Sequence, residues 1–92
     1  MQFEWDPEKA RKNARKHGVT FEEATTCFDD PLGLDFYDPD HSDNEDRYIL
    51  LALSRRGRVL LVVYTERKDR IRIISARKAT KKEEEFYYEN RI

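Results

Sequence analysis

The chain has 92 residues, of which 38% are hydrophobic and 40% are charged, and its formal net charge is -1. This length allows one domain with one modest core, so we expect a single domain over residues 1–92. Cys27 is the only cysteine, which excludes an intrachain disulfide and a zinc site built from several cysteines. Because the sequence has neither a long apolar run nor a signal-peptide pattern, we expect a cytoplasmic protein without a membrane span.

The near-zero net charge hides two segregated segments. Residues 29–46 contain eight acidic residues and no lysine or arginine, whereas residues 55–82 contain eleven lysines and arginines against two acids. A local basic excess of this size attracts phosphate backbones even when the whole chain is nearly neutral. The C-terminal half is therefore a candidate site for a polyanion, with the acidic segment either balancing its charge or facing a basic partner.

The first thirty residues predict a short strand followed by two helices. The alternation in QFEW indicates a strand over residues 2–5. Asp6 is placed to cap a helix that has proline at its first position and ends at Gly18. TFEE at residues 20–23 is a capping-box pattern for a second helix, which we expect to stop before Pro31.

The remaining sequence predicts strands and a final helix. Alternation over residues 32–36 indicates a half-buried strand, and residues 47–54 and 58–66 are apolar on both faces, as in central strands. RIRIISA at residues 70–76 predicts a further strand, and TKKE at residues 80–83 caps the last helix. The predicted fold class is α+β, with a short N-terminal strand, two helices, a mostly antiparallel four-stranded sheet and a C-terminal helix.

The alternation of side chains along the last strand predicts that its arginines lie on different faces of the sheet. Arg70 and Arg72 alternate with isoleucines, which suits a solvated face. Arg77 has the parity of the isoleucines, so we expect it to point toward the covered face, where it needs a carboxylate partner or a bound anion. Arg67 lies near the tip of the expected hairpin and Arg77 near its opposite end, so one phosphate is not expected to bind both.

Other candidate residues allow two interpretations each. His17 suits a general acid or base, but a histidine at the end of a basic helix also complements the helix dipole. Trp5 and Tyr64 can stack on nucleobases or pack in the core, and Glu66 can be a surface ion-pair partner. His41 lies in an acidic loop that lacks an EF-hand pattern, so we expect a solvated histidine and no metal site there.

Two long blocks resemble the BrnT family, the toxin half of a type II toxin–antitoxin system. The blocks are FEWDPEKARKNARKHGVTFEEA at residues 3–24 and RVLLVVYTERKDRIRIISARKAT at residues 58–80. The segment YDPDHSDNED at residues 37–46 departs from the pattern, although Glu45 and Arg47 match the Glu-x-Arg that opens the next strand. The resemblance covers nearly the whole chain.

The resemblance implies a RelE-like fold and a ribonuclease that inhibits translation and growth by cutting RNA. We expect no cofactor. It also implies a cognate BrnA-like antitoxin with a ribbon–helix–helix domain, through which the complex binds operator DNA. A dimer within the toxin–antitoxin complex is compatible with this picture.

A metal-independent mechanism suits these residues, with the ribose 2′-OH attacking the adjacent phosphate. Such chemistry needs cations on the phosphorane. The candidates for that role are Arg67 and Arg77, and those for moving protons are His17, Glu66 and Tyr64. The candidate RNA-binding residues are Lys9, Lys16, Trp5, Arg70 and Arg72.

Two other functions fit the sequence. A non-catalytic binding module would dock an acidic partner or nucleic acid on the basic face, and a metal-dependent nuclease would use the acidic loop. For the partner surface we expect the aromatic cluster at residues 86–88 or the basic first helix.

Overall fold

The computed structural model describes residues 1–91, which form five strands and three α-helices. The strands are β1 (Gln2–Glu4), β2 (Leu34–Asp38), β3 (Arg47–Leu53), β4 (Val59–Arg67) and β5 (Arg70–Lys78). The helices are α1 (Pro7–His17), α2 (Phe21–Thr26) and α3 (Lys81–Asn90), and two 3₁₀ turns are η1 (Cys27–Asp29) and η2 (Pro39–His41). None of the helices in this range is long and apolar enough to cross a membrane.

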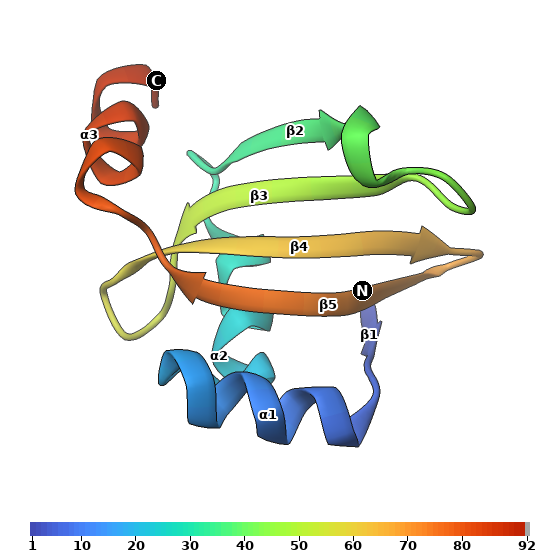
Figure 1. Cartoon of the computed structure of the whole chain (residues 1–92). Coiled ribbons are helices and arrows are strands. Elements are labelled where there is room, and N and C mark those ends of the chain that lie inside the picture. The colour runs from blue at the N-terminus through green and yellow to red at the C-terminus, as the bar shows by residue number, and fades with distance from the viewer. Residues whose placement is uncertain (92) are drawn as a thin grey trace.

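The strands form one sheet in the order β1-β5-β4-β3-β2 (Figure 1). All neighbours are antiparallel except β1, which runs parallel to β5 with Gln2 opposite Arg70. The predicted α+β class is confirmed. The expectation of a four-stranded sheet is wrong, because the N-terminal strand pairs with β5 and becomes the fifth strand.

The predicted caps set the ends of α1 and α3. The Asp6 carboxylate accepts a hydrogen bond from the Glu8 amide at 2.9 Å, and Gly18 ends α1 in the left-handed conformation at φ +68°. Thr80 and Glu83 form the complete capping box of α3. These local signals were therefore sufficient to place two of the three helices.

The capping box predicted for α2 forms only on one side. The Thr20 hydroxyl accepts from the Glu23 amide, as expected, but the Glu23 carboxylate turns inward. It accepts two hydrogen bonds from Arg58, at 2.9 and 2.6 Å, and one from the Ser54 hydroxyl. These bonds fasten α2 to the turn between β3 and β4, and the Arg58 guanidinium lowers the pKa of Glu23.

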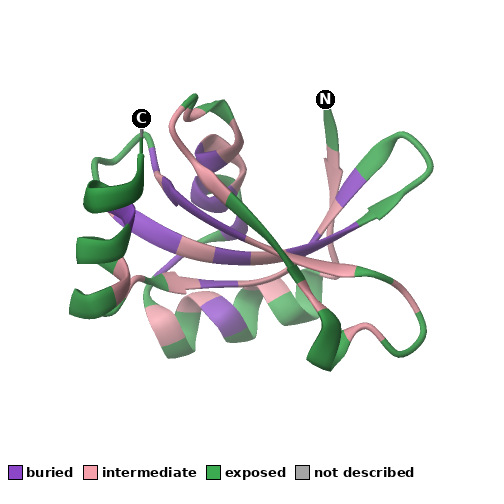
Figure 2. Cartoon of the chain, turned by 90° about the horizontal axis from the view of Figure 1, so that it is seen from above, coloured by how far each residue is buried: buried purple, intermediate pink, exposed green. Residues whose placement is uncertain are grey.

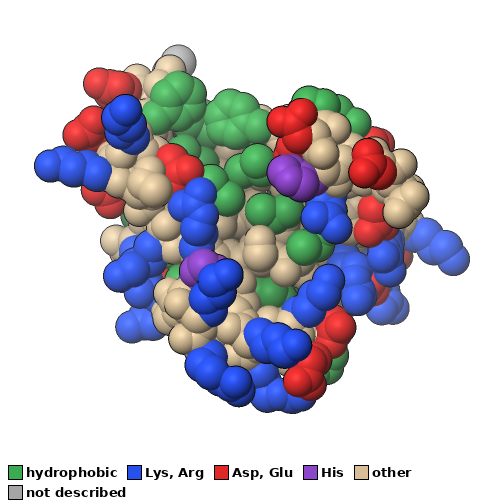
Figure 3. Space-filling view, in the orientation of Figure 1, with side chains coloured by type: hydrophobic (Ala, Val, Ile, Leu, Met, Phe, Trp, Pro, Cys, Tyr) green, Lys and Arg blue, Asp and Glu red, His purple; other side chains and the backbone are tan. Residues whose placement is uncertain are grey.

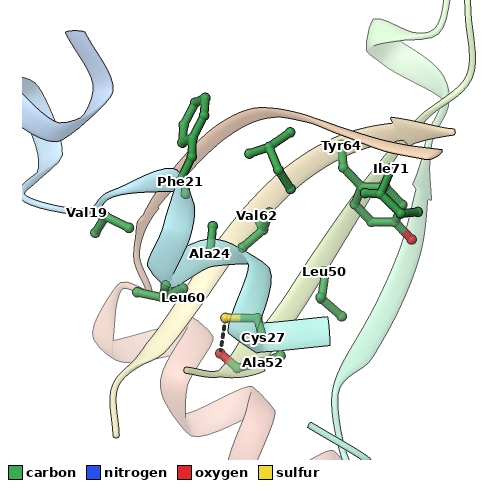
Figure 4. Close-up of a cluster of buried hydrophobic side chains, with 12 residues drawn as sticks. Val19, Phe21, Ala24, Cys27, Leu50, Ala52, Leu60, Val62, Tyr64 and Ile71 are labelled. Carbon is green, nitrogen blue, oxygen red and sulfur yellow. Dashed lines mark hydrogen bonds between the residues drawn. The ribbon is translucent and has the colours of Figure 1, made fainter. Parts of the chain in front are cut away.

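The main core lies between α2 and one face of the sheet, where buried side chains of β3, β4 and β5 converge (Figures 2 and 4). Cys27 is fully buried here and its thiol donates to the Ala52 carbonyl at 3.6 Å. Burial raises the pKa of the Cys27 thiol to about 12. Cys27 is therefore a packing residue.

A smaller core on the opposite face fixes α3. Tyr87 is completely buried against Leu51 and Val59, and its hydroxyl donates to the Asp30 carboxylate at 2.5 Å. Asp30 also accepts from the Leu53 amide, so it joins α3 to the end of β3. The rest of this face, toward the other ends of the strands, is not covered by a helix (Figure 1).

A β-bulge reverses the expected orientation of Arg77. Val63 pairs with Ser75 and the next residue of β4 pairs with Ile73, so Ile74 is the extra residue. Ile73 and Ala76 therefore both point into the main core, and Arg77 points to the opposite face. The prediction from pleat parity is wrong because strict alternation does not hold across the bulge.

Asn13 joins α1 to β5 just after the bulge. Its amide group donates to the Ala76 carbonyl at 2.7 Å and accepts from the Ala76 amide at 3.1 Å. A second donated bond reaches the Val19 carbonyl at 3.0 Å. The side chain thus pairs with β5 as a neighbouring strand would, and it holds α1 along the strand edge beyond β1.

Replacing Asn13 by alanine should destabilise the fold strongly. The substitution leaves buried backbone groups of Ala76 and Val19 without partners, so we expect a loss of about 2–4 kcal/mol in the free energy of unfolding. Urea unfolding of the wild type and Asn13→Ala measures this difference. The control Asn90→Ala, on exposed α3, should change stability by less than about 0.5 kcal/mol; equal effects would contradict the role of Asn13.

Candidate functional site

Two adjoining hollows lie on the open part of the sheet and beside α1. The larger, of about 420 Å³, extends over β3, β4 and β5. The smaller, of about 250 Å³, lies between α1 and β5. They share three lining residues, His17, Ile74 and Ser75, so they form one continuous depression, which we call the groove. The bulge therefore forms the middle of the groove floor.

The groove has basic walls and an apolar floor. Figure 3 shows lysine and arginine side chains around a hollowed area in which hydrophobic groups and backbone are visible. Lys9, Lys12 and Lys16 line its α1 side, and Arg47 lines the side nearest β3. Within residues 1–91, none of these four has a carboxylate within ion-pair distance. They are positive charges that remain available to an anion.

Three of the arginines predicted to contact RNA form ion pairs with glutamates outside the groove. Arg67 pairs with Glu45 through two bonds of 3.2 Å. Arg70 and Arg72 both reach the Glu4 carboxylate, at 3.6 and 3.0 Å. These exposed or half-exposed pairs neutralise the strand ends, as expected for the solvated face of a sheet.

Arg77 lines the groove but is held by α3. Its guanidinium donates to both oxygens of Glu83, at 2.8 and 2.9 Å. The carboxylate partner considered in the sequence analysis is therefore present. A phosphate must compete with Glu83 for this guanidinium or use its remaining N–H donors.

Arg67 and Arg77 do not share a site. Arg67 pairs with Arg70 at the hairpin tip, whereas Arg77 pairs with Leu61, six residues earlier on β4. Six residues of extended strand span about 20 Å. The predicted separation of the two arginines along the hairpin is confirmed.

Tyr64, Glu66 and Trp5 also lie outside the groove. Tyr64 points into the main core on the other face, where its hydroxyl donates to Asp35 at 2.7 Å, and burial is the main cause that raises its pKa. Glu66 has the same orientation and is exposed near the hairpin tip. Trp5 packs edge-on against Phe21 at 5.9 Å. The structure therefore does not bring these three candidates together with the groove residues, and the sheet separates Tyr64 from the groove.

The two histidines of the chain both line the larger hollow, although they are 24 residues apart in sequence. His17 is the last residue of α1, and His41 ends η2 near the start of β3. The His41 Nδ1 lies 2.9 Å from a carboxylate oxygen of Asp38, within hydrogen-bond distance. No pattern in the sequence indicates that His41 reaches the groove, because its position depends on how η2 folds over β3.

Comparison with known proteins identifies the family of this chain. A family model described as the ribonuclease toxin BrnT of a type II toxin–antitoxin system matches residues 5–83. The chain belongs to the BrnT family. The predicted family is therefore confirmed, and at the level of that family it is a ribonuclease toxin with an antitoxin partner. The match ends in the first turn of α3.

A solved BrnT structure has the same fold. The 1.1 Å crystal structure of the Brucella abortus ribonuclease toxin BrnT is similar with a TM-score of 0.67 and 20% sequence identity. The similarity covers 88% of this chain and 99% of the Brucella chain. A search of curated proteins gave no match.

This BrnT-family chain has an apolar hollow of about 310 Å³ next to the groove. Phe36 of β2 and Phe86 of α3 form its walls, with ring centroids 6.1 Å apart, and Ile49 and Leu61 belong to its floor. The phenylalanines are 41% and 44% exposed, which is high for such large apolar side chains. The aromatic segment expected to meet a partner is thus divided, with Tyr87 buried and Phe86 exposed.

Replacing Glu83 by glutamine should loosen α3 in a pH-dependent way. The hydrogen bonds from Arg77 lower the pKa of Glu83 from its ordinary value of 4.5 to about 2. Because the folded-state pKa lies below the unfolded one, the pair stabilises the fold above about pH 4.5, and this stabilisation is lost as the pH falls toward 2. At pH 7 we expect Glu83→Gln to lower the free energy of unfolding by about 1 kcal/mol, after allowance for the solvent exposure of the pair. For a domain of this size, that loss lowers Tm by about 5 °C.

Thermal unfolding at pH 7 and at pH 3 measures this effect. The difference between the wild type and Glu83→Gln should shrink at the lower pH. Glu84→Gln is the control, because Glu84 is an exposed neighbour on the same helix turn. A difference that stays constant with pH, or an equal effect of Glu84→Gln, would contradict the assigned pair.

Proposed function

We propose that this chain is a toxin that cuts RNA within the groove, without a metal ion, and thereby inhibits translation and growth. The single observation that supports this most strongly is the continuous groove, in which His17 lies between Arg47 and lysines that form no ion pair within residues 1–91. Cations without carboxylate partners are suited to a phosphate backbone. A histidine beside them supplies the proton transfer that a binding surface does not need.

The proposed reaction is an attack by the ribose 2′-OH on the adjacent phosphorus. The bond from phosphorus to the 5′ oxygen breaks, which leaves a 2′,3′-cyclic phosphate and a 5′-OH end. Lys12 and Lys16 hold the phosphates along α1, and Arg47 approaches from the β3 side. Arg77 contributes its remaining donors to the phosphorane, which carries additional negative charge in the transition state.

Only some of the residues predicted from the sequence take part in the proposed reaction. Arg67, Arg70 and Arg72 are placed outside the reaction, since each is paired with a glutamate away from the groove. His17 keeps its proposed role in proton transfer because it borders both hollows. The apolar floor at Ile74 and Val63 offers a surface on which a nucleobase or ribose can rest.

We further propose a BrnA-like ribbon–helix–helix antitoxin as the partner and the cytoplasm as the place of action. Operator DNA is then bound by the antitoxin, with the toxin carried in the complex, in which the toxin can also be dimeric. The apolar hollow between Phe36 and Phe86 is the proposed docking surface. Its position next to the groove means that a bound antitoxin lies close to the RNA path.

Substitutions in and outside the groove test the ribonuclease proposal. We expect the wild type to cut a single-stranded RNA in the presence of EDTA, and His17→Ala to lower kcat by about 100-fold or more. Lys12→Gln should weaken RNA binding and reduce the slope of log Kd against log salt by about 0.7, which is the contribution of one phosphate contact. Gel analysis of cleavage products and fluorescence titration at several salt concentrations measure the two effects.

Two controls lie outside the groove. Arg15→Gln removes an equal charge from the same helix, and Arg67→Ala removes the arginine at the hairpin tip; each should change the cleavage rate by less than about threefold. A large loss in Arg67→Ala would contradict the groove as the reaction site.

Salt-sensitive binding without products at any protein concentration would favour the binding module, and cleavage only with added magnesium or manganese would favour the metal-dependent nuclease.

Phe86→Ala tests the docking surface. Truncation of an exposed aromatic side chain that fits a partner commonly costs more than 1 kcal/mol of binding free energy. We therefore expect Phe86→Ala to raise the Kd for the antitoxin by about 10-fold or more, as measured by calorimetry. Tyr88→Ala is the matched control, because Tyr88 is 47% exposed on the same helix but outside the hollow. Unchanged binding by Phe86→Ala together with a loss in Lys12→Gln would place the partner on α1 instead.

A further inference from the structure

Asp38 and His41 form a carboxylate–imidazole pair at the edge of the groove. The His41 Nδ1 lies 2.9 Å from Asp38 Oδ2, and the other carboxylate oxygen of Asp38 accepts from the Asp40 amide at 3.2 Å. The Asp38 side chain is 14% exposed, whereas that of His41 is 68% exposed. A fixed carboxylate therefore orients a ring whose second nitrogen, Nε2, remains accessible.

The turn that carries this pair is itself fixed. The Ser42 hydroxyl donates to the Asp38 carbonyl and accepts from the Arg47 amide at 2.9 Å. These bonds join η2 to the first residue of β3. The imidazole is thus attached to the sheet rather than to a free loop, and preorganisation of this kind favours catalysis.

His41 lies across the groove from His17. The larger hollow is lined by both rings, and Val63 pairs with Ile49 on one side and with Ser75 on the other. The hollow thus spans three neighbouring strands, and two strand spacings amount to about 10 Å. A phosphodiester on this floor has one histidine toward each side.

The charges around the two rings differ. The His41 side carries Asp38 at the end of β2, Asp40 of η2 and Arg47 of β3, together with Asp43 and Glu45 of the following loop. His17 lies with lysines of α1 and faces Arg77. The two rings thus lie in different surroundings, with a carboxylate bonded to His41 and lysines beside His17.

We propose that His41, oriented by Asp38, is the general acid of the RNA cleavage reaction, with His17 as the general base; this inference depends on the proposed function. His17 accepts the 2′-OH proton as the 2′ oxygen bonds to phosphorus. The bond from phosphorus to the 5′ oxygen breaks, and His41 Nε2 donates its proton to that leaving oxygen. The proton count is unchanged, and no co-reactant is needed. Asp38 is a positioning residue.

A substrate that does not need an acid tests the role directly. The two substrates are an RNA dinucleotide and its analogue with sulfur in place of the 5′-bridging oxygen, because a thiolate leaves without protonation. We expect His41→Ala to cut the normal dinucleotide about 100-fold more slowly than the wild type does. On the sulfur analogue, the rate of His41→Ala should lie within about fivefold of the wild-type rate. His17→Ala should be slow on both substrates. His41→Ala should also lose the alkaline limb of the pH profile of kcat/KM.

Asp38→Asn and Asp40→Asn separate orientation from charge. Each substitution removes one negative charge near His41, but only Asp38 bonds the imidazole. Asp38→Asn should slow cleavage of the normal dinucleotide by about 10-fold, and the sulfur analogue should restore the rate. The cleavage rate of Asp40→Asn should stay within about twofold of the wild-type rate. Thermal unfolding of each variant checks that η2 and the fold are retained.

The outcomes separate this inference from the proposed function. If the wild type cuts neither substrate, both are wrong. If the wild type cuts RNA and His41→Ala is as active on the normal dinucleotide, the ribonuclease stands and the role of His41 is overturned. A loss in His41→Ala that the sulfur analogue does not rescue also overturns the role as general acid.

Discussion

The groove depends on the hydrogen bonds between the Asn13 amide and the backbone of Ala76. β1 pairs with β5 only as far as Arg72, so the outer backbone groups further along β5 need another partner. Asn13 supplies it, and in doing so sets the distance and rotation of α1 relative to the sheet. The lysines of α1 and His17 are therefore aligned with the bulge by a buried polar contact, since the apolar packing of such a short, basic helix provides little specificity.

The bulge and the ion pairs together decide which positive charges face the groove. Because Ile74 is an extra residue, Arg77 points to the same face as Val63 and joins the groove wall. Elsewhere on that hairpin, glutamates of β1 and the β2–β3 loop neutralise the arginines. A chain with nearly zero net charge thus retains a positive groove, because the ion pairs within residues 1–91 involve arginines and His41 and not the lysines of α1.

Much of the fold was predictable from local signals, and much of the site was not. Caps at Asp6, Gly18 and Thr80 depend on residues close in sequence, and two-sided apolar strands identify the sheet centre. The orientation of Arg77 was missed because a bulge depends on pairing between strands. The pairing of Arg67 joins residues 22 positions apart, and His41 reaches the groove only after η2 folds over β3. Such contacts leave no periodic trace in the sequence.

The unequal edges of the sheet have a consequence for self-association. At one edge, β1 pairs with residues 70–72 of β5 and the Asn13 side chain bonds Ala76, so these parts of the edge are closed to an additional strand. At the other edge, β2 is five residues long and carries Asp35 and Asp38. Carboxylates on an exposed strand disfavour pairing between two copies of the same edge. The arrangement that holds α1 in place therefore also protects a small, highly charged protein from growing into continuous sheets.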